Sequence, residues 1–425
     1  MILERMFNMH KVLVVGKGGR EHALAWKLAQ SPKVAQVFVA PGNAGMADVA
    51  TIISIKETNY DALVNFAKSE NITLTVIGPD QQVADGIVDL FQAEGLNVWG
   101  PTKKAAQIES SKTFAKDLMK KYNIPTAAYN VFFEKSAASQ YLSSVQFPQV
   151  IKADGLAAGK GVVIAQTLQE AETAIEEMMH DGKFGSAGAT VVIEEFLIGE
   201  EFSFMAFVNG EKVYPMELSR DHKRAYDDDI GPNTGGMGVY SPVPQIDRSV
   251  INESVENILK ATAKAMILEG CPFTGFLYGG IMATADGAKV IEFNARFGDP
   301  EAEVLLPRLE SDLYEILQDI LNGKEPAITW SSDVTVGVVL ASKGYPEQPI
   351  VGHEITGIEN LESETLVFHC GTGKTNNKYV TNGGRVLLLV RKEKDFVTAR
   401  QKVYEEIKKI KCSHMFFRTD IARNI

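Results

Sequence analysis

The stretch VIEFNARFGDPE, residues 290–301, places a carboxylate, an amide and a guanidinium at alternate positions. If it forms a β-strand, Glu292, Asn294 and Arg296 share one face, while Ile291 and Phe293 point to the core. Carboxylate and amide oxygens are ligands that Mg²⁺ accepts, and arginine binds phosphate or carboxylate oxygens through two N–H groups. The spacing predicts a site for a magnesium–phosphate complex. A solvated strand face with one salt bridge is the alternative.

A second candidate is KADGLAAGKGV, residues 152–162, in which two lysines flank a glycine-rich run. Backbone N–H groups in such runs approach phosphates closely. It is not a P-loop, because only three residues separate Gly155 from Gly159, and Gly161 stands where Ser or Thr is required. Strand-like sequences lie on both sides, so we predict a hairpin that folds over a nucleotide as a lid. An ordinary hairpin turn is the alternative.

Two further segments place basic residues beside glycines, RDHKR at 220–224 and GPNTGGMG at 231–238. Together they predict an anion cradle, with a charged surface loop as the alternative. We interpret His222 as structural or as a hydrogen-bond donor rather than a general base. The sequence offers no Ser/His/Asp or Cys/His arrangement for nucleophilic catalysis.

The elements that position these residues begin with a strand–helix alternation over the first hundred residues. Strands are expected at 11–16, 37–40, 75–78 and 97–100, which predicts a doubly wound parallel sheet with its ligand edge at the carboxyl ends of the strands.

The first strand-to-helix turn does not fit a dinucleotide fingerprint. Glu21 stands where the third glycine belongs, and Pro41-Gly42 replaces the acidic residue expected after the second strand. The loop is still expected to bind an anion through its N–H groups and Arg20 at the helix N-terminus, with a plain tight turn as the alternative.

The middle and the end of the chain follow other patterns. We expect a helix over 167–180 whose two methionines pack in the core, a strand over 190–197, and a mobile loop over 182–188. From residue 327 onward, three long apolar runs predict antiparallel strands, followed by a helix near 395–410. GTGKT at 371–375 lacks the outer glycine of a P-loop and is interpreted as a hairpin turn.

The composition of the chain limits its possible binding partners and cellular compartment. The net charge of −11 over 425 residues argues against non-specific nucleic-acid binding and against an anionic membrane surface. Three widely spaced cysteines favour a reducing cytosol and indicate neither a disulfide framework nor a zinc site. No apolar run reaches membrane-spanning length. Met9 is a candidate start, with residues 1–8 as an extension.

Several of these blocks, in this order, resemble the glycinamide ribonucleotide synthetase family, also called phosphoribosylamine–glycine ligases, of the ATP-grasp superfamily. The resemblance runs from about residue 10 to the end. Its carriers are GKGGREHALAWKL, APGNAG, KADGLAAGKGV, EEFLIGEEFS, DHKRAYDDDIGPNTGGMG, GFLYGG, EFNARFGDPE, TNGGRVL and FRTDI.

The resemblance implies a multidomain α/β and α+β chain. Its segments are an extension (1–9), a doubly wound N-terminal domain (10–102), an ATP-grasp core (103–121 and 192–326), a lid subdomain (122–191), and a small, mostly antiparallel C-terminal domain (327–425).

The resemblance also implies roles for individual residues. Those expected to bind ATP are Lys112, Lys152, Glu194, Glu195, Phe196, Leu197, Glu201, Arg224 and Asn233. Glu292 and Asn294 would ligate Mg²⁺ or Mn²⁺. The catalytic candidates are Arg296, Asp221 and Lys223. The residues expected to bind substrate are Gly18, Gly19, Arg20, Gly298 and Asp299.

The implied reaction joins glycine to 5-phosphoribosylamine through glycyl phosphate in de novo purine biosynthesis, in a cytoplasmic monomer. The nearest alternative is another ATP-grasp carboxylate–amine ligase or a carboxylase such as a biotin carboxylase. A dinucleotide-dependent oxidoreductase and a non-catalytic nucleotide sensor are more distant alternatives. The chain departs from the family pattern at GPDQQV, residues 78–83, where Asp80 replaces a glutamate, and the strand GGIMAT, residues 279–284, lacks the further acidic metal ligand of many ATP-grasp enzymes.

Overall fold

The computed structural model describes residues 9–156, 161–180, 188–423 and 425. It divides into two compact units, each built from separate stretches of chain. The first unit comprises Met1–Gly100, Met216–Gln245 and Arg296–Ile425, and the second comprises Pro101–Pro215 and Ile246–Ala295. This grouping does not test the boundaries expected from the sequence, which stay a prediction. Most of the loop expected at 182–188 and the lid residues 157–160 lie outside the described part.

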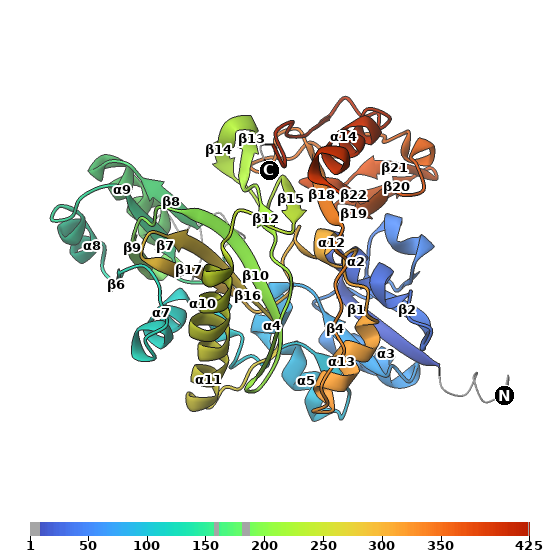
Figure 1. Ribbon diagram of the computed structural model, residues 1–425, viewed down its shortest axis with the longest axis horizontal. Coiled ribbons are helices and arrows are strands. Elements are labelled where there is room, and N and C mark those ends of the chain that lie inside the picture. The colour runs from blue at the N-terminus through green and yellow to red at the C-terminus, as the bar shows by residue number, and fades with distance from the viewer. Residues whose placement is uncertain (1–8, 157–160, 181–187, 424) are drawn as a thin grey trace. The chain divides into compact units, whose positions relative to one another are not determined.

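The first unit opens with the predicted parallel sheet, in the strand order β3-β2-β1-β4-β5 (Figure 1). Val12 to Val15 of β1 are fully buried, as expected for a central strand covered by helices on both faces. The order reverses between β1 and β4, and in such sheets ligands bind outside the carboxyl ends of the strands at that point. The elements are β1 His10–Gly16, α2 Gly19–Leu28, β2 Val34–Pro41, η1 Ala44–Asp48, β3 Thr51–Ile52, α3 Tyr60–Ser69, β4 Leu74–Ile77, α4 Asp80–Asp85, α5 Ile87–Ala93 and β5 Val98–Trp99.

The second sheet of the first unit joins segments about a hundred residues apart in sequence. Its order is β12-β15-β18-β22-β19, with β23 pairing β18, so the central segment supplies one edge of the predicted C-terminal antiparallel sheet. The elements are β12 Arg220–Asp221, β15 Gly238–Ser241, β18 Val334–Ser342, β19 Leu366–His369, β22 Arg385–Glu393 and β23 Met415–Phe416. The predicted C-terminal helix is α14, Phe396–Ile407.

Two small hairpins and several short helices complete the first unit. GTGKT lies in a hairpin, but it forms the first strand; the turn is the left-handed pair Asn376 and Asn377. The prediction that GTGKT is itself the turn was wrong by a few residues. The remaining elements are β13 Arg224–Tyr226, η4 Asp227–Asp229, β14 Ile230–Asn233, α12 Ala302–Leu305, α13 Leu313–Leu321, η6 Ile358–Asn360, β20 Thr372–Thr375 and β21 Lys378–Thr381.

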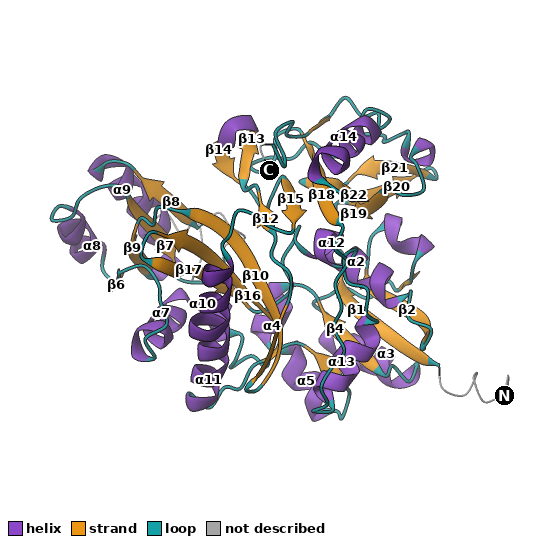
Figure 2. Cartoon of the chain, in the orientation of Figure 1, coloured by secondary structure: helices purple, strands orange, loops and turns teal. Residues whose placement is uncertain are grey.

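The second unit holds two four-stranded antiparallel sheets, in the orders β6-β9-β7-β8 and β11-β10-β16-β17 (Figure 2). Its strands are β6 Tyr129–Phe132, β7 Gln149–Ala153, β8 Val162–Ala165, β9 Val191–Glu195, β10 Glu200–Asn209, β11 Lys212–Pro215, β16 Thr274–Thr284 and β17 Gly287–Asn294. Its helices are α6 Gln107–Ser110, α7 Lys112–Lys121, α8 Lys135–Leu142, α9 Leu168–Ile175, η2 Glu176–His180, α10 Arg248–Glu253, η5 Ser254–Lys260 and α11 Ala261–Leu268, of which η2 and η5 are π-helical.

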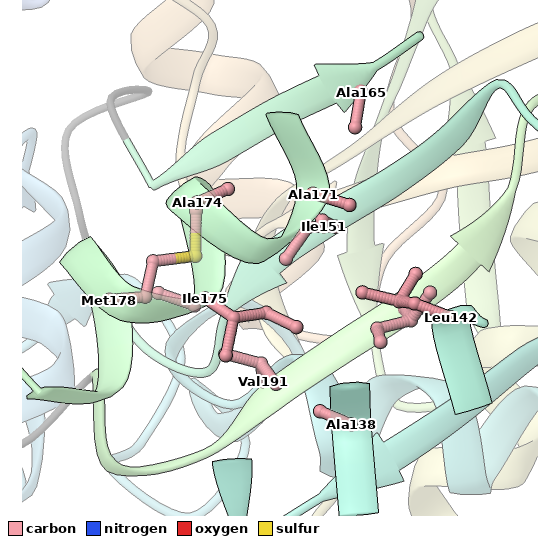
Figure 3. Close-up of a cluster of buried hydrophobic side chains, with 11 residues drawn as sticks. Ala138, Leu142, Ile151, Ala165, Ala171, Ala174, Ile175, Met178 and Val191 are labelled. Carbon is pink, nitrogen blue, oxygen red and sulfur yellow. The ribbon is translucent and has the colours of Figure 1, made fainter. Parts of the chain in front are cut away.

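The glycine-rich stretch of the second unit joins β7 to β8, which pair antiparallel, so the predicted hairpin is confirmed. Apolar side chains from α8, α9 and the strands pack against one another beneath it (Figure 3). Met178 is buried in this cluster and Met179 packs against it, which confirms both methionines as core residues. The helix that carries them is α-helical to Ile175 and π-helical from Glu176.

The strand that carries Glu292 contains a β-bulge. Gly280 of β16 pairs with Glu292, and Ile281 pairs with Val290, so Ile291 is an extra residue in β17. Val290 and Phe293 are buried, whereas Ile291 is half-buried. The prediction that Ile291 points to the core was therefore wrong, because the bulge interrupts the two-residue alternation. Arg296 is also not on the strand, which ends at Asn294.

No helix in the described ranges is long and apolar enough to cross a membrane.

Candidate active site

The predicted site residues fall into two groups, one in each compact unit. The second unit holds Lys112, Lys152, Glu194, Glu195, Phe196, Leu197, Glu201, Glu292 and Asn294. The first unit holds Gly18, Gly19, Arg20, Asp221, Lys223, Arg224, Asn233, Arg296, Gly298 and Asp299. Each group is described separately.

The centre of the second unit's group is a buried cluster of two lysines and one glutamate. Lys152 and Lys116 each lie within 3.0 Å of a carboxylate oxygen of Glu194, at 3.0 Å and 2.9 Å. All three side chains are at least 96% buried. Two ammonium groups therefore share one carboxylate in the interior. Two buried ammonium groups form a cationic cluster that suits a further anionic group such as a nucleotide phosphate, and the carboxylate of Glu292 offsets part of their charge.

Lys116 is a residue that the sequence analysis missed. It lies four residues after Lys112 on α7, and its Nζ also donates to Thr126 Oγ1 at 2.8 Å. Burial lowers its pKa to about 8, although Glu194 acts in the opposite direction. The signal in the sequence was the helical spacing KTFAK, which puts both lysines on one side of the helix.

Lys112 connects the start of α7 to the base of the glycine-rich hairpin. Its Nζ donates to the carbonyl oxygen of Gly155 at 2.9 Å, and the Asp154 carboxylate accepts from the N–H of Thr113 at 3.2 Å. Burial lowers the pKa of Lys112, while the nearby carboxylate of Glu292 opposes that shift most strongly. The predicted phosphate lysine and the predicted metal ligand therefore lie in the same electrostatic neighbourhood.

Glu292 and Asn294 both lie on β17 as half-buried residues of one strand face, as predicted. The end of that strand is held by Glu109 of α6, whose Oε2 accepts from the N–H of Ala295 at 2.7 Å. Within the described residues, no group of three or more His, Cys, Asp or Glu side chains is arranged to hold a metal ion. One carboxylate and one amide oxygen fit Mg²⁺, which commonly completes its shell with water and substrate phosphates.

The segment predicted to bind adenine connects β9 to β10. Glu194 and Glu195 end β9, and Phe196 and Leu197 are half-buried residues of the connection. Glu195 is fixed to Ala128 through its N–H, which donates to the Ala128 carbonyl at 2.9 Å. Glu201 follows as the second residue of β10, opposite Met282 of β16. Their binding roles stay a prediction.

In the first unit, Glu21 occupies the loop that was expected to bind an anion. Its Oε2 accepts from the N–H groups of Lys17 and Gly18 at 3.1 Å and 2.6 Å, and its Oε1 accepts from Arg20 Nε at 2.6 Å. A methyl group at Gly16 or Gly78 would collide with this buried side chain. An internal carboxylate therefore already accepts from the N–H groups of Lys17 and Gly18, and the anion-binding role expected of this loop stays a prediction.

Arg20 is buried, and its guanidinium has two further nitrogens. One of these, Nη1, lies 3.4 Å from the carbonyl oxygen of Phe297. Its pKa is raised: burial lowers it, but Glu21 and the carboxylates of Asp299 and Asp80 outweigh that effect. Arg296 is a further electrostatic neighbour. The fold thus gathers Arg20 with Arg296 and Asp299, three residues that the sequence analysis assigned to substrate and catalysis.

Asp299 is held by Arg385, which the sequence analysis quoted only as part of TNGGRVL. Arg385 Nη2 lies 2.7 Å from Asp299 Oδ1, and Nη1 donates to the carbonyls of Asp299 and Gly235 at 3.0 Å and 2.5 Å. A methyl group at Gly18 would lie 3.4 Å from Asp299 Oδ2. The arginine therefore fixes both Asp299 and the glycine loop that follows Asn233.

Asp221 lies against that same glycine loop. A methyl group at Gly236, whose φ is +111°, would lie 2.5 Å from Asp221 Oδ1 and from Pro300 Cδ. Gly298 belongs to the same FGDPE turn as Asp299 and Pro300. The structure therefore brings Asp221 to the FGDPE turn, and its catalytic role stays a prediction.

Arg224 and Asn233 are cross-strand neighbours on the β13–β14 hairpin. Arg224 Nη1 donates to the carbonyl of Gly231 at 2.9 Å, and the main-chain oxygen of Lys223 accepts from both the N–H and the hydroxyl of Thr234. Asn233 is therefore a strand residue rather than part of a glycine loop. His222 is half-buried, and its pKa is lowered to about 4, mainly by desolvation. A histidine that is neutral and enclosed at neutral pH fits the predicted structural role.

Comparisons with known proteins agree with this architecture. Three family models match consecutive parts of the chain: the phosphoribosylglycinamide synthetase N domain over residues 10–109, its ATP-grasp (A) domain over 110–302, and its C domain over 335–424. The chain belongs to the phosphoribosylglycinamide synthetase family. The resemblance and the fold class predicted from the motifs are thereby confirmed.

The chain is 56% identical over 411 residues to a phosphoribosylamine–glycine ligase of Halalkalibacterium halodurans, a match that covers 97% of this chain and 96% of that protein. It is similar to the crystal structure of phosphoribosylamine–glycine ligase from Thermotoga maritima, with a TM-score of 0.85, 35% identity, and coverage of 97% and 100%. A biotin carboxylase from Campylobacter jejuni has a TM-score of 0.75 at 14% identity, over 96% of this chain and 93% of that one, which shows a shared fold only.

Proposed function

We propose that the chain catalyses the reaction named by its phosphoribosylamine–glycine ligase relatives, joining glycine to 5-phosphoribosylamine with ATP in purine biosynthesis. The observation that carries the proposal is the buried cluster of Lys152, Lys116 and Glu194, whose two cations share one carboxylate in the unit that also carries Glu292 and Asn294. Buried lysines beside oxygen ligands for Mg²⁺ fit a nucleotide phosphate with its metal.

In the second unit, we assign nucleotide binding to the residues predicted for it. Lys112 and Lys152 bind phosphate oxygens, the main chain of 194–197 binds the adenine edge, and Glu201 binds the ribose hydroxyls. Glu292 and Asn294 hold the divalent metal. When bound, that metal neutralises phosphate charge and polarises the phosphoryl group. The metal is Mg²⁺ or Mn²⁺, because both accept carboxylate and amide oxygens and complete their shells with water and phosphate oxygens.

In the first unit, we assign substrate binding and charge stabilisation. Arg20 binds the phosphate of phosphoribosylamine, with Gly18 and Gly19 giving it close approach. Gly298, Asp299 and Asp221 line the place of glycine and the amine, with Lys223 beside them. Arg224 and Asn233 bind the phosphate end of ATP, and Arg296 stabilises the transferred phosphoryl group or the glycine carboxylate.

The reaction follows from these roles as two displacements. A carboxylate oxygen of glycine attacks the γ-phosphorus of ATP, the bond to the β–γ bridging oxygen breaks, and ADP leaves. The amino nitrogen of phosphoribosylamine then attacks the carbonyl carbon of glycyl phosphate, inorganic phosphate leaves, and the nitrogen loses a proton. Both steps need positioned cations and exclusion of water more than a side-chain nucleophile. Lys152, Lys112 and the arginines supply the cations, and the β7–β8 hairpin is the candidate lid.

We further propose that the protein works as a cytoplasmic monomer that binds neither nucleic acid nor membrane. The net charge of −11 supports the absence of nucleic-acid and membrane binding, and the unpaired cysteines fit a reducing compartment. The monomer is what the family resemblance implies. Sedimentation of the purified chain tests the monomer.

The deciding experiment measures ADP release with Mg²⁺ and ATP, with glycine and freshly generated 5-phosphoribosylamine supplied separately and together. Turnover that requires both substrates supports the ligase. Turnover stimulated by bicarbonate instead would make the chain a carboxylase on the same fold. ATP binding without turnover under any condition would make it a nucleotide sensor.

A further inference from the structure

The FRTDI motif near the C-terminus has no role in the function derived so far, yet its residues contact the hairpin that carries Arg224 and Asn233. We call residues 418–423 the C-terminal strap. Both segments belong to the first unit, and Figure 1 shows the C-terminus beside β13 and β14.

The tip of that hairpin needs support from outside itself. Asp228 and Asp229 adopt consecutive left-handed conformations, with φ of 58° and 53°. Non-glycine residues adopt this region uncommonly, and each costs of the order of 1 kcal/mol or more unless its surroundings hold it there. The strap supplies such contacts: the N–H of Thr419 donates to Asp227 Oδ1 at 2.7 Å, and the N–H of Asp228 donates to Asp420 Oδ2 at 2.9 Å.

Arg418 reaches both ends of the hairpin. Its side chain is 1% exposed, and Nη1 donates to the main-chain oxygen of Arg224 at 3.1 Å and to Asp229 Oδ1 at 2.8 Å. Nε and Nη2 donate to the Asp420 carboxylate at 2.7 Å and 2.6 Å. A planar guanidinium with four such bonds fixes the strand at Arg224 relative to the tip.

The strap is itself anchored on α14. Arg400 Nε and Nη2 donate to the carbonyls of Ile421 and Thr419 at 3.0 Å and 2.7 Å. The hydroxyl of Tyr404 donates to the Arg418 carbonyl at 2.8 Å and accepts from the N–H of Ile421 at 3.1 Å. Ile421 is fully buried against Gly238, where a methyl group would lie 2.5 Å from its Cδ1. The contacts thus form one continuous path from α14 through the strap to the hairpin.

We propose that the C-terminal strap is a positioning element for the ATP phosphates, in which Arg418 sets the direction of Arg224 and Asn233 by holding the main chain of their hairpin. The proposal rests on the function proposed above, because it takes Arg224 and Asn233 as phosphate contacts. Arg418 acts through Arg224 and touches no substrate. The strap is therefore a distant determinant of nucleotide affinity.

The test compares Arg418→Ala with three other variants in the ADP-release assay. Arg423→Ala is the matched control: Arg423 lies on the same strap, but it is 44% exposed, and its guanidinium pairs with the exposed Asp228 side chain at 3.3 Å. Tyr404→Phe removes one anchor of the strap and leaves Arg418 in place. Arg224→Ala gives the effect of losing the phosphate contact itself. Thermal unfolding of each variant sets a temperature at which all are folded.

We expect Arg418→Ala to raise the KM for ATP by about 10- to 100-fold, as for loss of a charged hydrogen bond, with the KM for glycine unchanged. Tyr404→Phe should raise it by a smaller factor, and Arg423→Ala should leave it unchanged. Wild-type KM for ATP in both Arg418→Ala and Tyr404→Phe, while Arg224→Ala raises it, would overturn the proposal and leave the proposed function standing.

Two other results would contradict, respectively, the positioning role of the strap and the proposed ligase function. An equal loss of kcat in Arg418→Ala and Arg423→Ala, with every KM unchanged, would make the strap merely structural. No glycine-dependent turnover in the wild-type chain would overturn the proposed function itself.

Discussion

The ammonium group of Lys152 donates to the main-chain oxygen of Ile291 at 3.0 Å, and Ile291 is the one residue by which β17 exceeds its partner strand. The bulge therefore turns a carbonyl out of the ladder and toward the predicted phosphate lysine. One irregular residue thus connects the strand of Glu292 and Asn294 to the cluster of Lys152 and Glu194.

Replacing Lys152 by Met should lower kcat/KM for ATP by about 100-fold or more, because a preorganised cation is lost from the phosphate site. Stability should fall by only about 1–3 kcal/mol, since Glu194 keeps Lys116 as its partner. Steady-state kinetics and chemical unfolding measure the two effects. Lys120→Met, on the exposed face of α7, is the control and should change neither. Equal kcat/KM in the two variants would remove Lys152 from the nucleotide site.

Glu292→Ala should reduce turnover to below about 1% of wild type at any practical Mg²⁺ concentration, since Glu292 is the one charged ligand proposed for the metal. The measurement is turnover as a function of Mg²⁺ concentration. Glu256→Ala removes an exposed carboxylate that pairs with Lys260 in the same unit, and it should behave as wild type. Full activity of Glu292→Ala would refute the metal assignment.

Gly236→Ala should displace Asp221 or Pro300, because the new methyl group would lie 2.5 Å from each. The left-handed backbone adds about 1–3 kcal/mol of destabilisation. Gly323→Ala is the matched control, with φ of +71° and open space around the added methyl. Both variants should lose stability, but only Gly236→Ala should also lose glycine-dependent turnover. Comparable turnover in both would mean that Asp221 is not at the substrate.

The buried Glu303 of α12 should make the stability of the protein depend on pH. It is fully buried, neither carboxylate oxygen has a hydrogen-bond partner among the described residues, and it lies beside Gly19. Burial, and then Asp299, raise its pKa well above its ordinary value, while Arg385 and Arg20 act in the opposite direction; the Cys370 thiol is the other titratable neighbour.

A raised folded-state pKa means that the stability which Glu303 contributes is complete below its unfolded value of about 4.5 and is lost as pH rises toward the folded one. Glu303→Gln keeps the shape of the neutral acid and cannot ionise. The free energy of unfolding of wild type, relative to Glu303→Gln, should therefore fall as pH rises from about 5 to 8 in denaturant titrations. A constant difference across that range would show that Glu303 is ionised throughout.

The regular elements could be predicted because their signals are local. The apolar runs of β1, β18 and β22 and the amphipathic face of α9 depend on residues within one element. The motifs likewise placed Lys152 on a hairpin strand and Glu292 with Asn294 on one face.

The features that could not be predicted depend on contacts between residues far apart in the sequence. The bulge at Ile291 exists only relative to β16, and β12 and β15 are too short for periodicity and pair in a sheet with a strand about a hundred residues later. Glu21 was noticed only as a missing glycine, although its carboxylate holds the loop N–H groups. Arg385 appeared in a quoted motif, but its partner Asp299 lies 86 residues earlier.

The position of β12 and β15 at one edge of the C-terminal sheet constrains how the chain folds during synthesis. β15 pairs with β12 on one side and with β18 on the other, and β18 begins at Val334, so residues 216–245 leave the ribosome long before their sheet is complete. The path of the chain passes between the two units four times, at residues 100, 215, 245 and 295. The second unit is complete once Ala295 has been made, whereas the first must wait for its last strands. In a prematurely terminated chain the side of β15 that pairs with β18 is therefore exposed, and it is an aggregation hazard.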